Sequence, residues 1–90
     1  MHMIVILLAG GGSESPDRMA LLEDLLWAHA DPEVDLEHLR VRRTRNGLEA
    51  VALMGGTSEA RAQLGARTLL ERAGNALAAQ GYTVAAPPLG

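Results

Sequence analysis

Arginine is concentrated in one short segment of this chain. All eight basic residues are Arg, and four of them fall within six positions: Arg40, Arg42, Arg43 and Arg45. A guanidinium group binds carboxylates and phosphates through two parallel hydrogen bonds, so the strip favours contact with an acidic partner surface. The alternative is a solvated edge strand whose charges discourage edge-to-edge aggregation. We expect a salt-sensitive partner-binding surface made of Arg40 and Arg42 with the apolar Val51 and Leu53.

Two glycine-rich segments precede predicted helices. The first, Gly10-Gly11-Gly12-Ser13, is a candidate anion or ligand loop, because the N–H groups at a helix N-terminus can hold an anion. It lacks the Lys of a phosphate-binding loop, and Glu14 would repel an anion. A turn leading into an ordinary capped helix is therefore the favoured interpretation. The same interpretation is favoured for the second segment, residues 55–58.

Few residues are suited to catalysis or metal binding. His29 and His38 lie in separate predicted elements, and neither has an acidic residue at the spacing of a metal-binding helix face. No Ser has an evident His and carboxylate partner, and Glu23 and Asp24 are adjacent on a helix, so they do not face each other. Cys is absent, which excludes thiol chemistry. We expect no catalytic residue, no metal and no cofactor, and a binding role in preference to an enzymatic one.

Composition restricts the class of protein further. Ninety residues form one domain, and a net charge of -3 argues against binding to nucleic acid. No apolar run approaches the roughly 20 residues that span a bilayer, and there is no signal-peptide pattern. With Cys absent, these features predict a cytoplasmic protein, and the Arg, Ala and Gly content suggests a bacterial source. Met1-His2 is interpreted as a vector-derived start, and residues 87–90 as a tail.

The first predicted strand is apolar on both faces. Residues 3–9 contain no polar side chain, whereas a strand with one solvated face alternates apolar and polar residues. The chain offers two helices, which suffice to cover one face of a small sheet. The other face therefore needs a partner, which we expect to be a second copy. Side chains alternate along a strand, so the helices meet one of two sets: Ile4, Ile6 and Leu8, or Met3, Val5 and Leu7.

Capping residues and periodicity predict the other elements. Ser15 as N-cap and Pro16 begin a helix that extends to about Ala30, before Asp31-Pro32. Asn46-Gly47 predicts a hairpin between strands at 39–44 and 48–54. A second helix follows Ser58 and ends near Gly81, and residues 82–86 form a short last strand. The apolar stripe of that second helix is predicted as Ala60, Leu64, Leu70, Ala73 and Leu77, broadened by Ala62, Ala66 and Leu69.

The resulting order, β-α-β-β-α-β, predicts an α+β protein with the ferredoxin-like plait, one antiparallel sheet with both helices on one face. In that layout the first and third strands are central. A turn centred on Asn46-Gly47 sets the hairpin register. It pairs Leu39 with Met54 and Val41 with Ala52 on the helix-covered face. On the other face it pairs Arg40 with Leu53, Arg42 with Val51, and Thr44 with Glu49.

Leu21, Leu25 and Trp27, followed by an apolar strand, Gly55-Gly56 and an Ala/Leu-rich helix, resemble small effector-associated domains of actinobacterial conflict and signalling systems. The resemblance covers most of the chain and implies an adaptor role. Ligand-sensing ACT domains share the same element order. We therefore expect a non-catalytic, self-associating protein-interaction module, forming a homodimer and binding an acidic protein partner. Two alternatives stay open: a small-molecule sensor with its ligand at the dimer interface, and a cofactor-free enzyme using the open sheet face.

Overall fold

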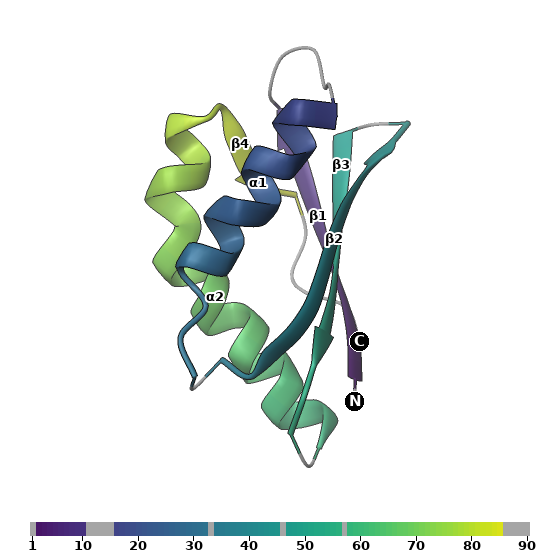
Figure 1. The fold of residues 1–90 in the computed structure, drawn as a ribbon, viewed down its shortest axis with the longest axis vertical. Coiled ribbons are helices and arrows are strands. Elements are labelled where there is room, and N and C mark those ends of the chain that lie inside the picture. Colours follow the sequence, from purple (N-terminus) through teal and green to yellow (C-terminus); the bar gives the residue numbers. More distant parts are fainter. Residues whose placement is uncertain (1, 11–15, 33, 46, 57, 86–90) are drawn as a thin grey trace.

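The two helices lie side by side against one face of a twisted sheet (Figure 1). This computed structural model describes residues 2–10, 16–32, 34–45, 47–56 and 58–85. The elements follow the predicted order: β1 (His2–Gly10), α1 (Pro16–Ala28), β2 (Leu36–Thr44), β3 (Gly47–Met54), α2 (Glu59–Ala79) and β4 (Tyr82–Val84). Ser15, Asn46 and Ala86, which the sequence assigns to a cap, a turn and the last strand, lie outside the described residues.

The protein is α+β, with one open, four-stranded antiparallel sheet in the order β2-β3-β1-β4. The long strands β1 and β3 are central, as the predicted layout requires. The edge strands differ in length, since β2 has nine residues and β4 only three. Both helices cover the same face, so no described helix or strand covers the opposite face of the central strands (Figure 1).

The face of β1 that meets the helices is now identified. Ile4 and Ile6 are fully buried and Leu8 is 2% exposed, whereas Met3 is 56% exposed. The core lies between this face and the two helices, and Leu22 and Leu26 of α1 are fully buried in it. The set Met3, Val5 and Leu7 therefore belongs to the open face.

The predicted hairpin register is wrong by two residues. Arg40 pairs with Val51, Arg42 with Glu49, Val41 with Ala50, Leu39 with Ala52 and Thr44 with Gly47. Gly47 is thus the first residue of β3 and not part of the turn, which leaves residues 45 and 46 between the paired positions. Its φ of 156° and the Leu8 carbonyl, which occupies the place of a Cβ, both require glycine there. A shift of two keeps each side chain on its predicted face, because strand side chains alternate with a period of two.

The helices also differ in detail from the prediction. α1 ends at Ala28 and not at Ala30. On α2, Ala60 is exposed and Leu64 is 61% exposed, which contradicts their place in the predicted stripe. Of the other predicted residues, Ala62, Ala66, Leu69, Ala73 and Leu77 are buried, and Gly65 joins them. Glycine at position 65 lets α2 approach the loop before β2, because the Val34 carbonyl oxygen lies 2.7 Å from the position that a Cβ would take.

An arginine of α1 joins the C-terminal part of the fold. The Nη2 of Arg18 donates to the Gln80 carbonyl oxygen at 2.9 Å, just beyond the end of α2. Its Nε lies 3.4 Å from the hydroxyl of Tyr82, and the guanidinium lies 5.6 Å from the centre of that ring. Tyr82 is itself buried. Arg18 therefore connects α1 to the end of α2 and to the short strand β4.

Candidate functional site

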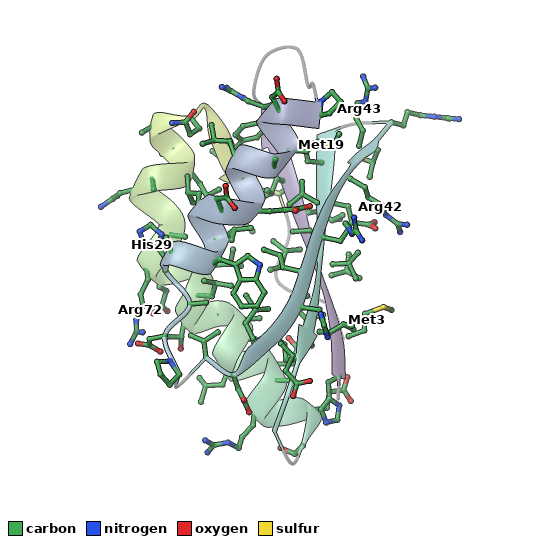
Figure 2. The ribbon with its side chains drawn as sticks, viewed as in Figure 1. Met3, Met19, His29, Arg42, Arg43 and Arg72 are labelled. Atoms are coloured by element: carbon green, nitrogen blue, oxygen red, sulfur yellow. The ribbon has the colours of Figure 1, made fainter. Side chains whose placement is uncertain are left out.

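The uncovered face of the sheet carries an apolar centre and a basic side. Three rows of paired residues cross it from β1 through β3 to β2. We call these nine residues the open face: Met3, Leu53 and His38; Val5, Val51 and Arg40; Leu7, Glu49 and Arg42. In Figure 2 the labelled Met3 and Arg42 project away from the helices, whereas His29 and Arg72 lie on the helix side. The four residues predicted to bind a partner, Arg40, Arg42, Val51 and Leu53, therefore lie together on one face.

Five apolar side chains form the centre of the open face. Met3 is 56% exposed, and Val5, Leu7, Val51 and Leu53 are half-buried by their neighbours on the same sheet. Their direct neighbours along β1, Ile4 and Ile6, are fully buried under the helices. The contrast arises because neither helix reaches around to this side (Figure 1).

The two arginines of the open face have different surroundings. Arg42 pairs with Glu49 directly across the hairpin, with Nη2 at 2.5 Å and Nε at 2.7 Å from the same carboxylate oxygen. Its charge is therefore already balanced within the chain. Arg40 is exposed, and no hydrogen bond or ion pair joins its guanidinium to any of the described residues. Arg40 is the cation of this face that is available to an external group.

The arginine strip does not form one continuous surface. Arg43 pairs with the buried Leu48, so it lies on the helix side of the edge strand, and Arg45 lies in the turn. Only Arg40 and Arg42 share the open face. The alternation of side chains along β2 causes this division, since consecutive strand residues point to opposite sides.

The free edge of β2 is partly occupied by α1. Glu23 Oε2 accepts a hydrogen bond of 2.8 Å from the Val41 backbone N–H. That N–H belongs to an edge strand, where it would otherwise be available to a strand of another chain. Glu23 therefore satisfies a donor of the edge and hinders edge-to-edge pairing, a role that sequence spacing did not indicate.

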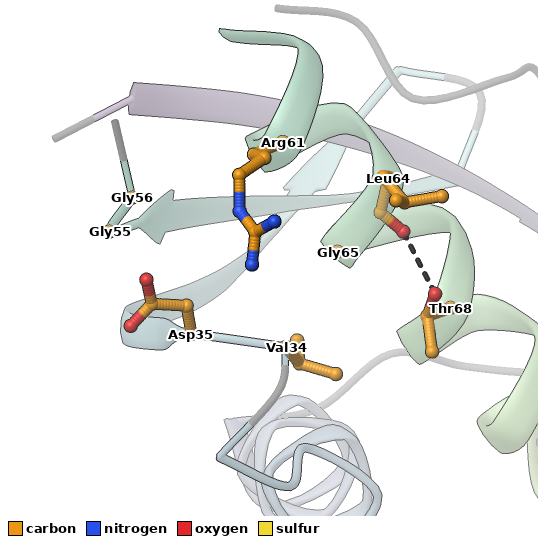
Figure 3. Close-up of a pocket in the computed structure, with 8 residues that line it drawn as sticks. All are labelled: Val34, Asp35, Gly55, Gly56, Arg61, Leu64, Gly65 and Thr68. Atoms are coloured by element: carbon orange, nitrogen blue, oxygen red, sulfur yellow. Dashed lines mark hydrogen bonds between the residues drawn. The ribbon is translucent and has the colours of Figure 1, made fainter. Parts of the chain in front are cut away.

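Two hollows lie on the surface of the described part of the chain. The first, of about 580 Å³, lies over the β2 side of the open face and is lined by Met3, Glu23, His38, Leu39, Arg40, Val51 and Leu53. The second, of about 390 Å³, lies beside the N-terminal half of α2 and is lined by Val34, Asp35, Gly55, Gly56, Arg61, Leu64, Gly65 and Thr68 (Figure 3). The first contains three of the four residues predicted for partner binding.

The second hollow brings two opposite charges to its walls. Arg61 extends from α2 toward the hollow, and the carboxylate of Asp35 lies beside Gly55 and Gly56 (Figure 3). Asp35 has a φ of 63°, and its carbonyl accepts a 2.8 Å bond from the Gly55 N–H. The hydroxyl of Thr68 donates to the Leu64 carbonyl at 3.0 Å, so its donor is used inside the helix. The bond from Gly55 to Asp35 therefore joins the loop before β2 to the loop after β3 at the wall of this hollow.

The remaining candidates have structural roles. His29 Nδ1 lies 2.9 Å from the Leu25 carbonyl and donates to it at the end of α1. Gly10 has a φ of 96°, and the Gly81 carbonyl lies where its Cβ would stand, so close approach of β4 explains this glycine. Gly11, Gly12 and Ser13 lie outside the described residues. Within the described ranges, no group of three or more His, Cys, Asp or Glu side chains is placed to hold a metal ion.

The comparisons with protein-family models, curated proteins and solved structures found no match. Neither helix in the described part of the chain is long and apolar enough to cross a membrane.

Proposed function

We propose that this chain is a non-catalytic, self-associating interaction module that meets a second copy of itself through the open face. The observation that carries the proposal is the uncovered apolar centre of that face, above all Met3 at 56% exposure beside the half-buried Val51 and Leu53. A contiguous apolar patch with a polar rim is typical of an interaction site.

We assign the fold to the ferredoxin-like plait. The strand order, read from the other edge as β4-β1-β3-β2, supports this assignment, as do the antiparallel pairs and the position of both helices on one face. A plait has one sheet face without helices. Covering that face with a second sheet is a direct way to remove its apolar side chains from water.

The free energy of burial permits weak association. A fully exposed side chain of this kind contributes about 1.5 to 3 kcal/mol when buried, and four of these five are already more than half buried, which leaves about 0.5 to 1 kcal/mol each. Five from each copy contribute on the order of 5 to 10 kcal/mol, against the roughly 4 to 15 kcal/mol that association costs. The largest net gain, about 6 kcal/mol, corresponds to a dissociation constant of tens of micromolar.

The charges of the open face select one arrangement of the two sheets. A twofold axis perpendicular to the strands would place β2 over β2 of the second copy and bring the two Arg40 side chains together. An axis parallel to the strands places β2 of one copy over the β4 edge of the other. On that edge Thr83, which pairs with Ala9, is uncharged. The second arrangement avoids repulsion between like charges, so we propose a parallel axis.

An adaptor role in the bacterial cytoplasm is the biological context we propose. Its support is the resemblance to effector-associated domains, together with the Cys-free and Arg-, Ala- and Gly-rich composition. The acidic protein partner stays a prediction, and Arg40 is the residue we expect it to contact. Nucleic acid is not an expected partner, because the chain has a net charge of -3.

Sedimentation velocity of matched leucine variants tests self-association. Leu53→Glu places a charge at the centre of the open face, and Leu64→Glu makes the same change on α2, where the side chain is 61% exposed. We expect the unmodified protein and Leu64→Glu to be dimeric and Leu53→Glu to be monomeric with unchanged helical circular dichroism. An unmodified protein that is monomeric at high micromolar concentration would refute the proposal.

A further inference from the structure

The hollow over the β2 side of the open face has the size and lining of a ligand site. Its volume of about 580 Å³ falls within the range of roughly 300 to 1,000 Å³ usual for small-molecule pockets. Met3 of β1 and the pair Val51 and Leu53 of β3 supply an apolar surface. These three side chains lie next to one another because Met3 pairs with Leu53 across the central strands.

The polar part of the lining is concentrated on β2. His38 and Arg40 follow one another on the same side of this strand, opposite Leu53 and Val51 respectively. Each therefore stands beside an apolar side chain of the neighbouring strand. Both are exposed, and neither side chain has a hydrogen bond or ion pair to another described residue. Glu23 is the one acid in the lining, and its Oε2 is held by the Val41 N–H.

We propose that this hollow binds a small organic acid with one carboxylate and an apolar body. The carboxylate pairs with the Arg40 guanidinium, with His38 beside it, and the apolar body lies on Met3, Val51 and Leu53. A single available guanidinium matches one carboxylate, which it holds through two parallel hydrogen bonds. All of these contacts come from one chain. The inference goes beyond self-association, but Met3, Val51 and Leu53 also belong to the proposed dimer contact, so the carboxylate and the second copy compete for this face.

The test uses straight-chain carboxylates as probes. Acetate, butyrate, hexanoate and octanoate are titrated into the full chain, with hexanol as the uncharged counterpart, and binding is followed by amide chemical shifts. We expect saturable binding whose affinity rises with chain length, with the largest shifts in β2 and β3. Hexanol should bind at least about ten-fold more weakly than hexanoate, because it lacks the charge-assisted hydrogen bonds.

Matched arginine variants locate the carboxylate. Arg40→Gln removes the available cation, and Arg43→Gln makes the same change of net charge on the helix side of β2. Both residues are exposed, so both variants should keep the fold. We expect Arg40→Gln to weaken hexanoate binding about ten-fold or more and Arg43→Gln to leave it within about two-fold. Val51→Ser should reduce the dependence on chain length without abolishing it.

Three results would overturn the proposal: no saturable binding at millimolar concentrations, an affinity independent of chain length, or equal weakening in the two arginine variants. Sedimentation of the protein without carboxylate, over a range of protein concentrations, separates this inference from the proposed function. A protein that is monomeric without carboxylate and binds hexanoate through Arg40 would support the ligand site and refute self-association. A dimer that binds no carboxylate even after dilution to the monomer would do the reverse.

Discussion

Substitution by alanine at two glycines of α2 is expected to change the stability of the protein in opposite directions. Gly65 and Gly74 both lie within the helix, where glycine is disfavoured relative to alanine by about 1 kcal/mol. At Gly65 an added Cβ would lie 2.7 Å from the Val34 carbonyl oxygen and 3.1 Å from Met54 Cε. At Gly74 no described atom outside the neighbouring turns of the helix lies within 4 Å of that position.

The expected free energies follow from these distances. Gly74→Ala should gain about 0.5 to 1 kcal/mol of unfolding free energy, because the unfolded chain loses freedom and nothing in the fold is displaced. Gly65→Ala has the same favourable effect on the unfolded chain. It also forces α2 away from Val34, since ordinary contact begins at 3.4 Å. Overpacking of this kind costs about 1 to 3 kcal/mol, so the variant should be destabilised by up to about 2 kcal/mol.

Urea unfolding followed by circular dichroism measures both variants under identical conditions. A difference of about 2 kcal/mol between them corresponds to roughly 8 to 16 °C in melting temperature for a domain of this size. Equal stabilisation of both variants would refute the close approach of α2 to the loop at Val34. Equal destabilisation would show that Gly74 is packed against something other than its own helix.

Three further substitutions test contacts between distant parts of the chain. Arg18→Ala should lower the unfolding free energy by about 1 to 2 kcal/mol, with Arg18→Lys intermediate, because only Arg reaches both Gln80 and Tyr82; urea titration checks this. Glu23→Ala should lower the unfolding free energy by about 1 kcal/mol and increase aggregation, measured by light scattering. Glu23→Gln keeps an acceptor for the Val41 N–H, so its stability and light scattering should be close to those of the unmodified protein. Arg42→Ala should change the unfolding free energy by less than about 1 kcal/mol, because that side chain is 67% exposed; a loss of several kcal/mol would contradict this ranking.

The sequence was sufficient to predict which residues of β2 and β3 share the open face. The alternation of side chains along β2 and β3 placed Arg40, Arg42, Val51 and Leu53 on one side of the sheet. The predicted side of each residue is correct despite the error in register, because the error was an even number of residues. The hollow, the hydrogen bond from Val41 to Glu23, and the neutralisation of Arg42 by Glu49 were not predictable. Each depends on which residues of different elements become neighbours.

The elements and their order were determined by the sequence itself, because caps, turn residues and apolar periodicity act over a few residues along the chain. Only the tertiary structure decided which face of β1 meets the helices, since both sets of its side chains are apolar. It also decided that Gly65 lies on the buried side of α2, where the carbonyl of Val34 from a distant loop takes the place of a side chain. The contact between Arg18 and Tyr82 joins positions 64 residues apart, and no local sequence pattern predicts such a pairing. Contacts of this range form only when the whole chain is folded.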